Sequence, residues 1–431
     1  MNNNLMKSLG SKGSLAGALA FLLPFLSLVT LWGVSVCSFV FFLAALYHFR
    51  ACRTALAHHW LEVRWVVAGF FLFALFSVFA LVVHPEARSG SIEKPVRMFL
   101  GISALALVLA FKPDRKYLWW GVAGGAALGA MLVGYQRFAL DTDRPHGLTN
   151  AIVTGDILLC FGLVALAAAL DMRGRHNSAW AALGAVAGFA GSLITGTRGG
   201  WVALMLAAIL FILYGRRMLS GPVRLLVLAS FALVAGTFAV PQSGMHERVR
   251  QGVKDVTTYF DGVNAYSNIG IRLELWRGAG LLLAERPLLG IDRAGAQREM
   301  ARYVQEGELN AVVLPAEHFH NDALQVLVTG GAFGFIAWLA ILVTPLVFFA
   351  RQLRRRAGAG RGHFAAALAG MLVVVSYFSF GLTEVIFWSV KASLLYTLMV
   401  FVLMGLCLNA KDEDGRQGDG KQGDGKQGDG K

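Results

Sequence analysis

Residues 65–83 read WVVAGFFLFALFSVFALVV and contain no charged side chain. As an α-helix they would be about 28 Å long, close to the roughly 30 Å hydrocarbon core of a bilayer. Similar apolar runs recur along nearly the whole sequence. Hydrophobic residues make up 56% of the 431 residues and charged residues only 15%, whereas a soluble domain carries about a quarter charged residues. The sequence therefore predicts an all-α membrane protein.

The apolar runs predict about 12 transmembrane helices. Residues 1–240 would hold the first nine helices, 241–322 a large helical loop, 323–410 the last three helices, and 411–431 a polar, disordered tail. Within the loop, the segments 247–259, 270–285 and 294–305 have the pattern of amphipathic helices. The predicted spans lie near 15–31, 34–49, 65–83, 97–111, 118–137, 149–170, 179–196, 199–215, 222–240, 323–350, 363–383 and 386–408.

The net charge of +13 is not pooled in one patch, as nucleic-acid binding would favour, but falls in alternate connections between the apolar runs. Lysine and arginine mark cytoplasmic loops, so both termini should be cytoplasmic. The connections 85–95, 141–150, 195–200, 241–322 and 383–385 should then face outward together. Three of the four cysteines lie in apolar runs, which argues against a disulfide framework.

Two arginines stand out on the predicted outward side. Arg198 lies between two apolar spans in TGTRGGW, where an arginine is costly without a partner and the glycines allow a large ligand to approach. Arg272 opens the loop helix 270–285 and shares a face with Trp276, four residues on. The alternatives are an arginine that reaches the membrane interface and an ordinary exposed helix arginine.

His320 lies in HFHND, just before the predicted tenth span. A histidine near neutral pH can act as general base or acid, with Asn321 or Asp322 to orient its ring. His318 could join it in ligating a metal, but no third ligand is evident beside the pair in the sequence, so we expect no metal. Both histidines could also be ordinary polar residues at the interface.

The other outward connections offer weaker candidates. Arg144 could line a polar pocket, and Lys94 could contact a ligand or simply pair with a nearby glutamate. Asp141 and Asp143 form a D-x-D pair, for which loop solvation is the more economical interpretation than a bound cation. Several arginines with one histidine suit a phosphate-bearing substrate, because guanidinium groups bind phosphate oxygens in pairs.

Residues 190–340 resemble the bacterial O-antigen ligases (WaaL), within the wider superfamily of O-antigen ligases and polymerases. Three blocks carry the resemblance: the glycine-rich arginine TGTRGG at 195–200, Arg272-x-x-x-Trp276 followed by ERPLLG at 285–290, and His320-Asn321 followed by glycines at 331 and 334. The first half of the chain is similar only in hydropathy and in the loop from Arg144 to residue 150.

The resemblance implies an inverting, metal-independent glycosyltransferase of the GT-C class without a cofactor. Its donor would be O-antigen linked to undecaprenyl pyrophosphate, and its acceptor a sugar hydroxyl of lipid A–core, at the periplasmic face of a Gram-negative inner membrane. Arg198 and Arg272 would bind the pyrophosphate, and His320 would position or deprotonate the acceptor.

Two groups of alternatives remain open. An O-antigen polymerase or a protein O-glycosyltransferase belongs to the same superfamily. A transporter for an anionic lipid would also explain the outward arginines, but it predicts several ionisable residues near the membrane midplane and an internal repeat. Asp156, in the predicted sixth span, is the one such carboxylate.

Overall fold

The computed structural model describes residues 3–83, 92–172, 175–197, 199–215, a few residues between 224 and 236, 245–355 and 360–424. The described residues form helices, turns and loops without a β-strand. Seven helices are long and apolar enough to cross a bilayer, as expected from the apolar runs. They are α4 (Trp60–Val83), α5 with α6 (Glu93–Leu100 and Ile102–Phe111), α7 (Lys116–Phe138), α8 (Ala151–Ala168), α15 (Asp322–Arg354), α16 (Arg361–Gly381) and the first part of α17 (Val390–Asp424).

Three more predicted spans correspond to shorter apolar stretches, in α1 (Asn3–Ser27), in α9 (Arg175–Ile194), and in α10 (Trp201–Leu210) with the π-turn after it. The predicted span 34–49 is α2 (Gly33–Tyr47), and the chain then bends by 93° into α3 (Phe49–His58). The predicted span 222–240 lies largely outside the described residues. The number of twelve spans therefore stays a prediction.

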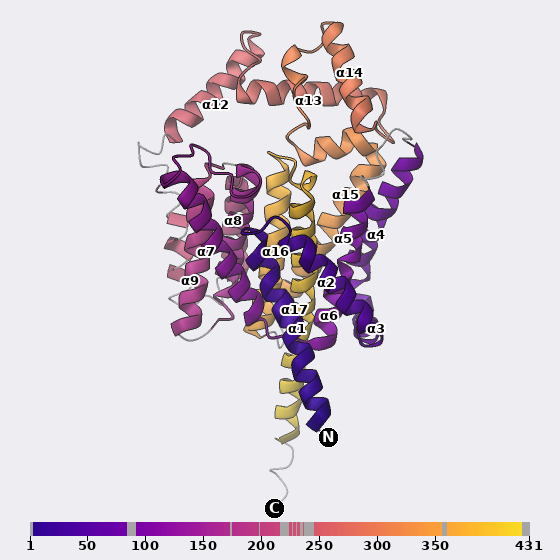
Figure 1. Cartoon of the computed structure of the whole chain (residues 1–431), viewed down its shortest axis with the longest axis vertical. Coiled ribbons are helices and arrows are strands. Elements are labelled where there is room, and N and C mark those ends of the chain that lie inside the picture. The colour runs from indigo at the N-terminus through magenta and orange to yellow at the C-terminus, as the bar shows by residue number, and fades with distance from the viewer. Residues whose placement is uncertain are drawn as a thin grey trace, which may run out of the picture.

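The bundle has two unlike ends. A cap of three helices, α12 (Met245–Phe260), α13 (Asn268–Glu285) and α14 (Arg293–Gln305), lies at one end, and both chain termini lie at the other (Figure 1). These helices match the three predicted within the loop 241–322, and that prediction is confirmed.

Ion pairs join the basic connections at the end that carries the termini. Arg115 contacts Asp171 at 3.0 Å and Glu413 at 3.2 Å, and Arg355 contacts Glu62 at 3.3 Å. These residues come from connections that the sequence pattern placed on one side, so the structure confirms that they share one end of the bundle. Which side of the membrane that end faces stays a prediction.

The tail that was predicted to be disordered from residue 411 begins as a continuation of α17. α17 continues to Asp424, well past residue 411. Its first polar turn is held by contacts with other helices: Lys411 lies 2.8 Å from Glu62, and Asp414 accepts a hydrogen bond from the Gly360 backbone at 2.6 Å. Composition alone pointed to disorder because it could not reveal these partners.

Candidate active site at the junction of cap and bundle

The helical cap has a hydrophobic core of its own, which continues into the start of α15. Its buried members include Leu275 and Leu282 on α13, Met300 and Tyr303 on α14, and Val328 on α15. Glu274, which the sequence left without a role, is also buried here and accepts hydrogen bonds from the Tyr259 hydroxyl at 2.6 Å and the Asn310 backbone at 2.7 Å. The cap is therefore packed as a unit and fixed to α15.

A break in α15 makes this attachment. Gly331 has φ 59° and ψ −160°, a conformation essentially reserved for glycine, and a Cβ there would lie 2.2 Å from the Leu288 carbonyl carbon. The freed backbone groups pair with the segment after α13: Ala332 N donates to Pro287 O at 2.9 Å, and Ile291 N donates to Val328 O at 2.8 Å. The segment 285–290 and the glycine at 331, noted separately in the sequence, thus form one junction.

His320 lies just before α15 and is held from both sides. Its backbone is left-handed, with φ 49°. On one side, Trp276 Nε1 donates to Phe319 O at 2.9 Å. On the other, Asn321 caps α15 by accepting from Leu324 N at 3.1 Å and donates to Leu382 O, also at 3.1 Å. One short segment before α15 therefore contains or contacts three of the predicted site residues, Trp276, His320 and Asn321.

The partner of both histidines is Glu384, which the sequence analysis did not single out. His320 Nδ1 lies 3.2 Å from Glu384 Oε2, and His318 Nε2 lies 3.5 Å from Glu384 Oε1. Glu384 is only 6% exposed and also accepts a hydrogen bond from the Val385 backbone. A carboxylate at His320 Nδ1 favours the neutral tautomer with its proton on that atom, which leaves the Nε2 lone pair free to accept a proton.

The charges of this group depend on one another. Burial acts to raise the pKa of Glu384, but the hydrogen bonds from His320 and from the Val385 backbone and the proximity of the two histidines outweigh burial, so the pKa lies below its ordinary value. Burial lowers the pKa of His318, and the nearby Glu384 only partly opposes that effect. We therefore assign an ionised Glu384 and a neutral His318.

Arg272 completes the described part of the cluster. It is half-buried, and burial lowers the pKa of its guanidinium, an effect that Glu384 opposes and Arg144 reinforces. Arg272 thus lies within electrostatic range of Glu384 and of a second, exposed cation, Arg144. The guanidinium remains charged at neutral pH, since an arginine is deprotonated only far above it. That these arginines and histidines form one substrate site stays a prediction.

Arg198 lies outside the described residues, but the residues on either side of it are described. Thr197 donates from its hydroxyl to Ala151 O at 3.0 Å. A Cβ on Gly199 would lie 2.1 Å from the Thr383 hydroxyl oxygen, one residue before Glu384. The backbone on both sides of position 198 is therefore packed against α8 and the Glu384 connection.

Asp156 on α8 is buried near this turn. It is fully buried, and neither carboxylate oxygen has a hydrogen-bond partner among the described residues. A Cβ on Gly200 would lie 3.7 Å from Asp156 Oδ1. Among the described residues, Asp156 therefore neither caps a helix nor hydrogen-bonds within the bundle.

Other candidates have partners within the protein. Lys94 donates to the Phe387 carbonyl oxygen and lies near the buried Asp322. Asp143 contacts Arg137 at 3.4 Å and is fully exposed, as expected of a solvated loop. Ligand contact by Lys94 stays a prediction.

Glu384 also changes the assessment of a metal at the histidines. The ligating atoms of His318, His320 and Glu384 lie within 4.8 Å of one another, so a third ligand exists in space although none was evident in the sequence. However, the His320 backbone N–H points at His318 Nδ1, 3.4 Å away. The neutral His318 ring then carries its proton on Nε2, the atom facing Glu384, and this favours a hydrogen-bonded group over a metal centre.

Together, the fold and this site define a multi-pass helical membrane protein whose extramembrane cap meets the bundle at a histidine–glutamate pair, with Arg272 within electrostatic range of the glutamate. Residues 183–339, which include Arg198, Arg272 and His320, match the family model described as O-antigen ligase. This match places the segment 183–339 in the O-antigen ligase superfamily, whose members are glycosyltransferase-like enzymes. An uncharacterized protein of Haemophilus influenzae is 24% identical over 291 residues, which cover 66% of this chain and 72% of that relative.

Proposed function

We propose that this protein is an O-antigen ligase. It transfers O-antigen polysaccharide from undecaprenyl pyrophosphate to a sugar hydroxyl of lipid A–core at the periplasmic face of the inner membrane. The observation that carries the proposal is the His320–Glu384 pair, 3.2 Å apart at the junction of cap and bundle, with Arg272 within electrostatic range of Glu384. It supplies a base for a hydroxyl and a cation for a phosphate in one place.

The base is His320. With Glu384 holding the proton on Nδ1, Nε2 accepts the proton of the acceptor hydroxyl as its oxygen attacks the anomeric carbon. The bond from that carbon to the pyrophosphate oxygen breaks in the same step, and the configuration inverts. Glu384 touches neither reactant. It is a positioning residue that also stabilises the imidazolium formed when His320 takes the proton.

The leaving pyrophosphate is stabilised by arginines. Arg272 would meet the negative charge that develops on the leaving oxygen, with Arg198 as its partner and Arg144 at the outer rim. This arrangement supplies cationic charge from side chains alone, so the proposed reaction is independent of metal and of cofactors.

The membrane arrangement follows from the positive-inside rule. Both termini and the ion-paired end of the bundle lie in the cytoplasm, and the cap of α12 to α14 lies in the periplasm. We also propose about 12 spans and the GT-C class of glycosyltransferase fold, since the described apolar helices and the predicted span 222–240 together approach that number.

The test is transfer in vitro from lipid-linked polysaccharide to purified lipid A–core, with EDTA present. His320→Ala should reduce turnover by about 10²- to 10⁴-fold, the usual contribution of a general base. Arg198→Ala and Arg272→Ala should each weaken transfer by roughly 2–5 kcal/mol, since a charged partner of the pyrophosphate is lost. His176→Ala, at an exposed histidine on α9, is the matched control and should retain activity. Full activity of His320→Ala, or a strict metal requirement, would contradict the proposal.

Deletion of the gene separates the ligase from its relatives. A ligase mutant should lack all long chains on lipid A–core while the polymer still accumulates on the lipid carrier. Loss of polymerisation with single-unit addition intact would indicate a polymerase instead. Normal lipopolysaccharide with unglycosylated proteins would indicate a protein O-glycosyltransferase.

A further inference from the structure

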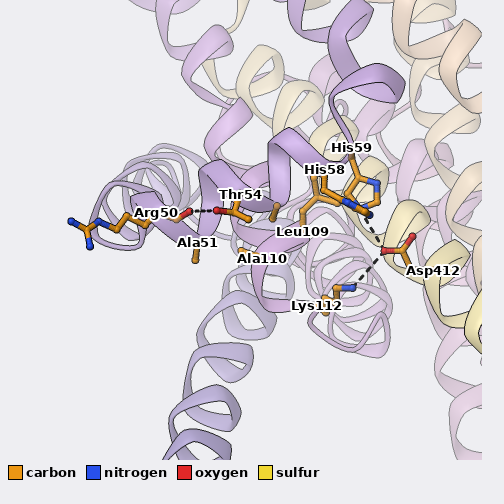
Figure 2. Close-up of a pocket in the computed structure, with 10 residues that line it drawn as sticks. Arg50, Ala51, Thr54, His58, His59, Leu109, Ala110, Lys112 and Asp412 are labelled. Carbon is orange, nitrogen blue, oxygen red and sulfur yellow. Dashed lines mark hydrogen bonds and ion pairs between the residues drawn. The ribbon is translucent and has the colours of Figure 1, made fainter.

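A second group of metal-ligating side chains lies at the opposite end of the bundle, near both termini (Figure 2). His58 ends α3, His59 lies at the corner between α3 and α4, and Asp412 lies on α17. Their ligating atoms are within 4.8 Å of one another. All three line a cavity of about 580 Å³.

His59 lies between two carboxylates. Its Nδ1 is 3.7 Å from Glu62 Oε1 and its Nε2 is 3.5 Å from Asp412 Oδ2, and the ring is only 6% exposed. A neutral imidazole has one N–H and one lone pair, so it can donate to only one of the two carboxylates. The other nitrogen then turns its lone pair toward a negative oxygen, which is unfavourable unless a cation lies between them.

We propose that His58, His59 and Asp412 bind a Zn²⁺ ion. In this arrangement His59 Nδ1–H donates to Glu62 and Nε2 binds the metal, the orientation that an outer carboxylate usually imposes on a ligating histidine. Two imidazoles and one carboxylate suit zinc, whose bonds of about 2.0–2.1 Å in a tetrahedron separate the ligand atoms by roughly 3.3–3.4 Å. The 3.5 Å between His59 Nε2 and Asp412 Oδ2 is already close to that value.

The surroundings also allow the third protein ligand, a fourth ligand and an outer partner that zinc binding needs. The exposed His58 side chain can change rotamer without disturbing packing, and its ring centroid lies 4.8 Å from that of His59. The cavity leaves room for water at the fourth zinc position. Glu62, the outer partner of His59, is itself fixed by Lys411 and Arg355.

Lys112 opposes metal binding. Its Nζ lies 3.5 Å from Asp412 Oδ2, the same oxygen that faces His59. The ammonium group neutralises Asp412 when no metal is bound, so the ion must displace it. Zinc affinity is therefore limited by Lys112 and should rise when this charge is removed.

A bound ion would tie the corner between α3 and α4 to α17 at Asp412, next to the ion pair between Lys411 of α17 and Glu62 of α4. The site lies at the other end of the bundle from His320. Its predicted effect is on the stability of the fold and is independent of the proposed transfer reaction.

The test is a zinc titration of the full-length protein, purified in detergent without a polyhistidine tag and stripped with chelator. The wild type should bind Zn²⁺ in calorimetry, and His58→Ala and Asp412→Asn should each weaken binding by roughly tenfold or more. Lys112→Gln should tighten it. Zn²⁺ should also raise the melting temperature of the wild type but not of His58→Ala, a variant at an exposed position.

The second histidine cluster provides the matched control. His318→Ala removes a histidine from the group around Glu384 and should leave the high-affinity zinc site intact. Loss of binding in His318→Ala with retention in His58→Ala would overturn the proposal, because zinc would then bind at the other cluster. Absence of zinc uptake by the wild type at neutral pH would also overturn it.

Discussion

Glu384→Gln is the substitution that most directly tests the proposed site. The change keeps the size of the side chain and removes its negative charge. In the structure the carboxylate is 6% exposed, lies 3.2 Å from His320 Nδ1 and also faces His318. A glutamine amide can still accept from His320, but it cannot stabilise the imidazolium that forms when His320 takes a proton.

The expected loss follows from that hydrogen bond. A bond to a charged group contributes about 1.5–3 kcal/mol, and the buried position limits screening by salt. At roughly 1.4 kcal/mol for each factor of ten, kcat should fall by about 10- to 150-fold. The KM for the lipid-linked donor should change little, because Arg198 and Arg272 rather than Glu384 are proposed to bind the pyrophosphate.

The assay is steady-state transfer to lipid A–core, with a thermal melt of each variant to verify folding. Glu317→Gln is the matched control: it is the same substitution beside His318, at a side chain that is 69% exposed and pairs with Arg293 at 3.5 Å. Its activity should stay within about twofold of wild type. An unchanged kcat for a well-folded Glu384→Gln, or a loss confined to donor KM, would refute the positioning role.

Three further outcomes follow from the structure. Gly331→Ala should destabilise the protein by about 1–3 kcal/mol or more, because the backbone conformation at Gly331 is reserved for glycine. Gly280→Ala, where no atom lies near the new Cβ, should instead stabilise α13 by about 0.5–1 kcal/mol. Thermal or denaturant unfolding measures both changes. Burial lowers the pKa of His318, so the unfolded state binds its proton first and stability should fall as the pH drops below about 6.5. His318→Gln should lessen that decline in melting temperature, and an identical pH dependence would contradict the assignment. Trp276→Phe should lower kcat through loss of its 2.9 Å hydrogen bond to Phe319 O, with zinc binding by the protein unaffected.

Much of the fold could be predicted from hydropathy and charge, because lipid requires apolar, internally hydrogen-bonded helices and basic loops gather on one side. The sharp bend at the end of α2 could not be predicted in this way. Residues 34–49 are apolar enough for one span, but α3 is amphipathic, and its basic residues and terminal histidines belong to the polar end of the bundle. Hydropathy averaged over a window does not detect such a change of direction.

In the site, too, residues in short local patterns could be predicted, whereas a residue defined by a contact distant in sequence was missed. His320, Asn321 and Trp276 could be found because short patterns mark them. No short pattern marks Glu384, because its role depends on contact with His320, 64 positions away. One signal was available: it is a carboxylate in a connection of three residues between apolar spans, where an ionised group is costly without a partner. The same connection is also one of those predicted to face outward.

The backbone of His320 links the cap to the proposed chemistry. A left-handed φ of 49° is unfavourable for a residue with a Cβ and persists only where the surroundings impose it. Here the cap imposes it through Trp276 and the bundle through Asn321, which bonds to the connection that carries Glu384. The distance between His320 and Glu384 is therefore set by the seating of the cap on α15. A shift of the cap on α15 should change this distance and with it the proposed positioning of the base.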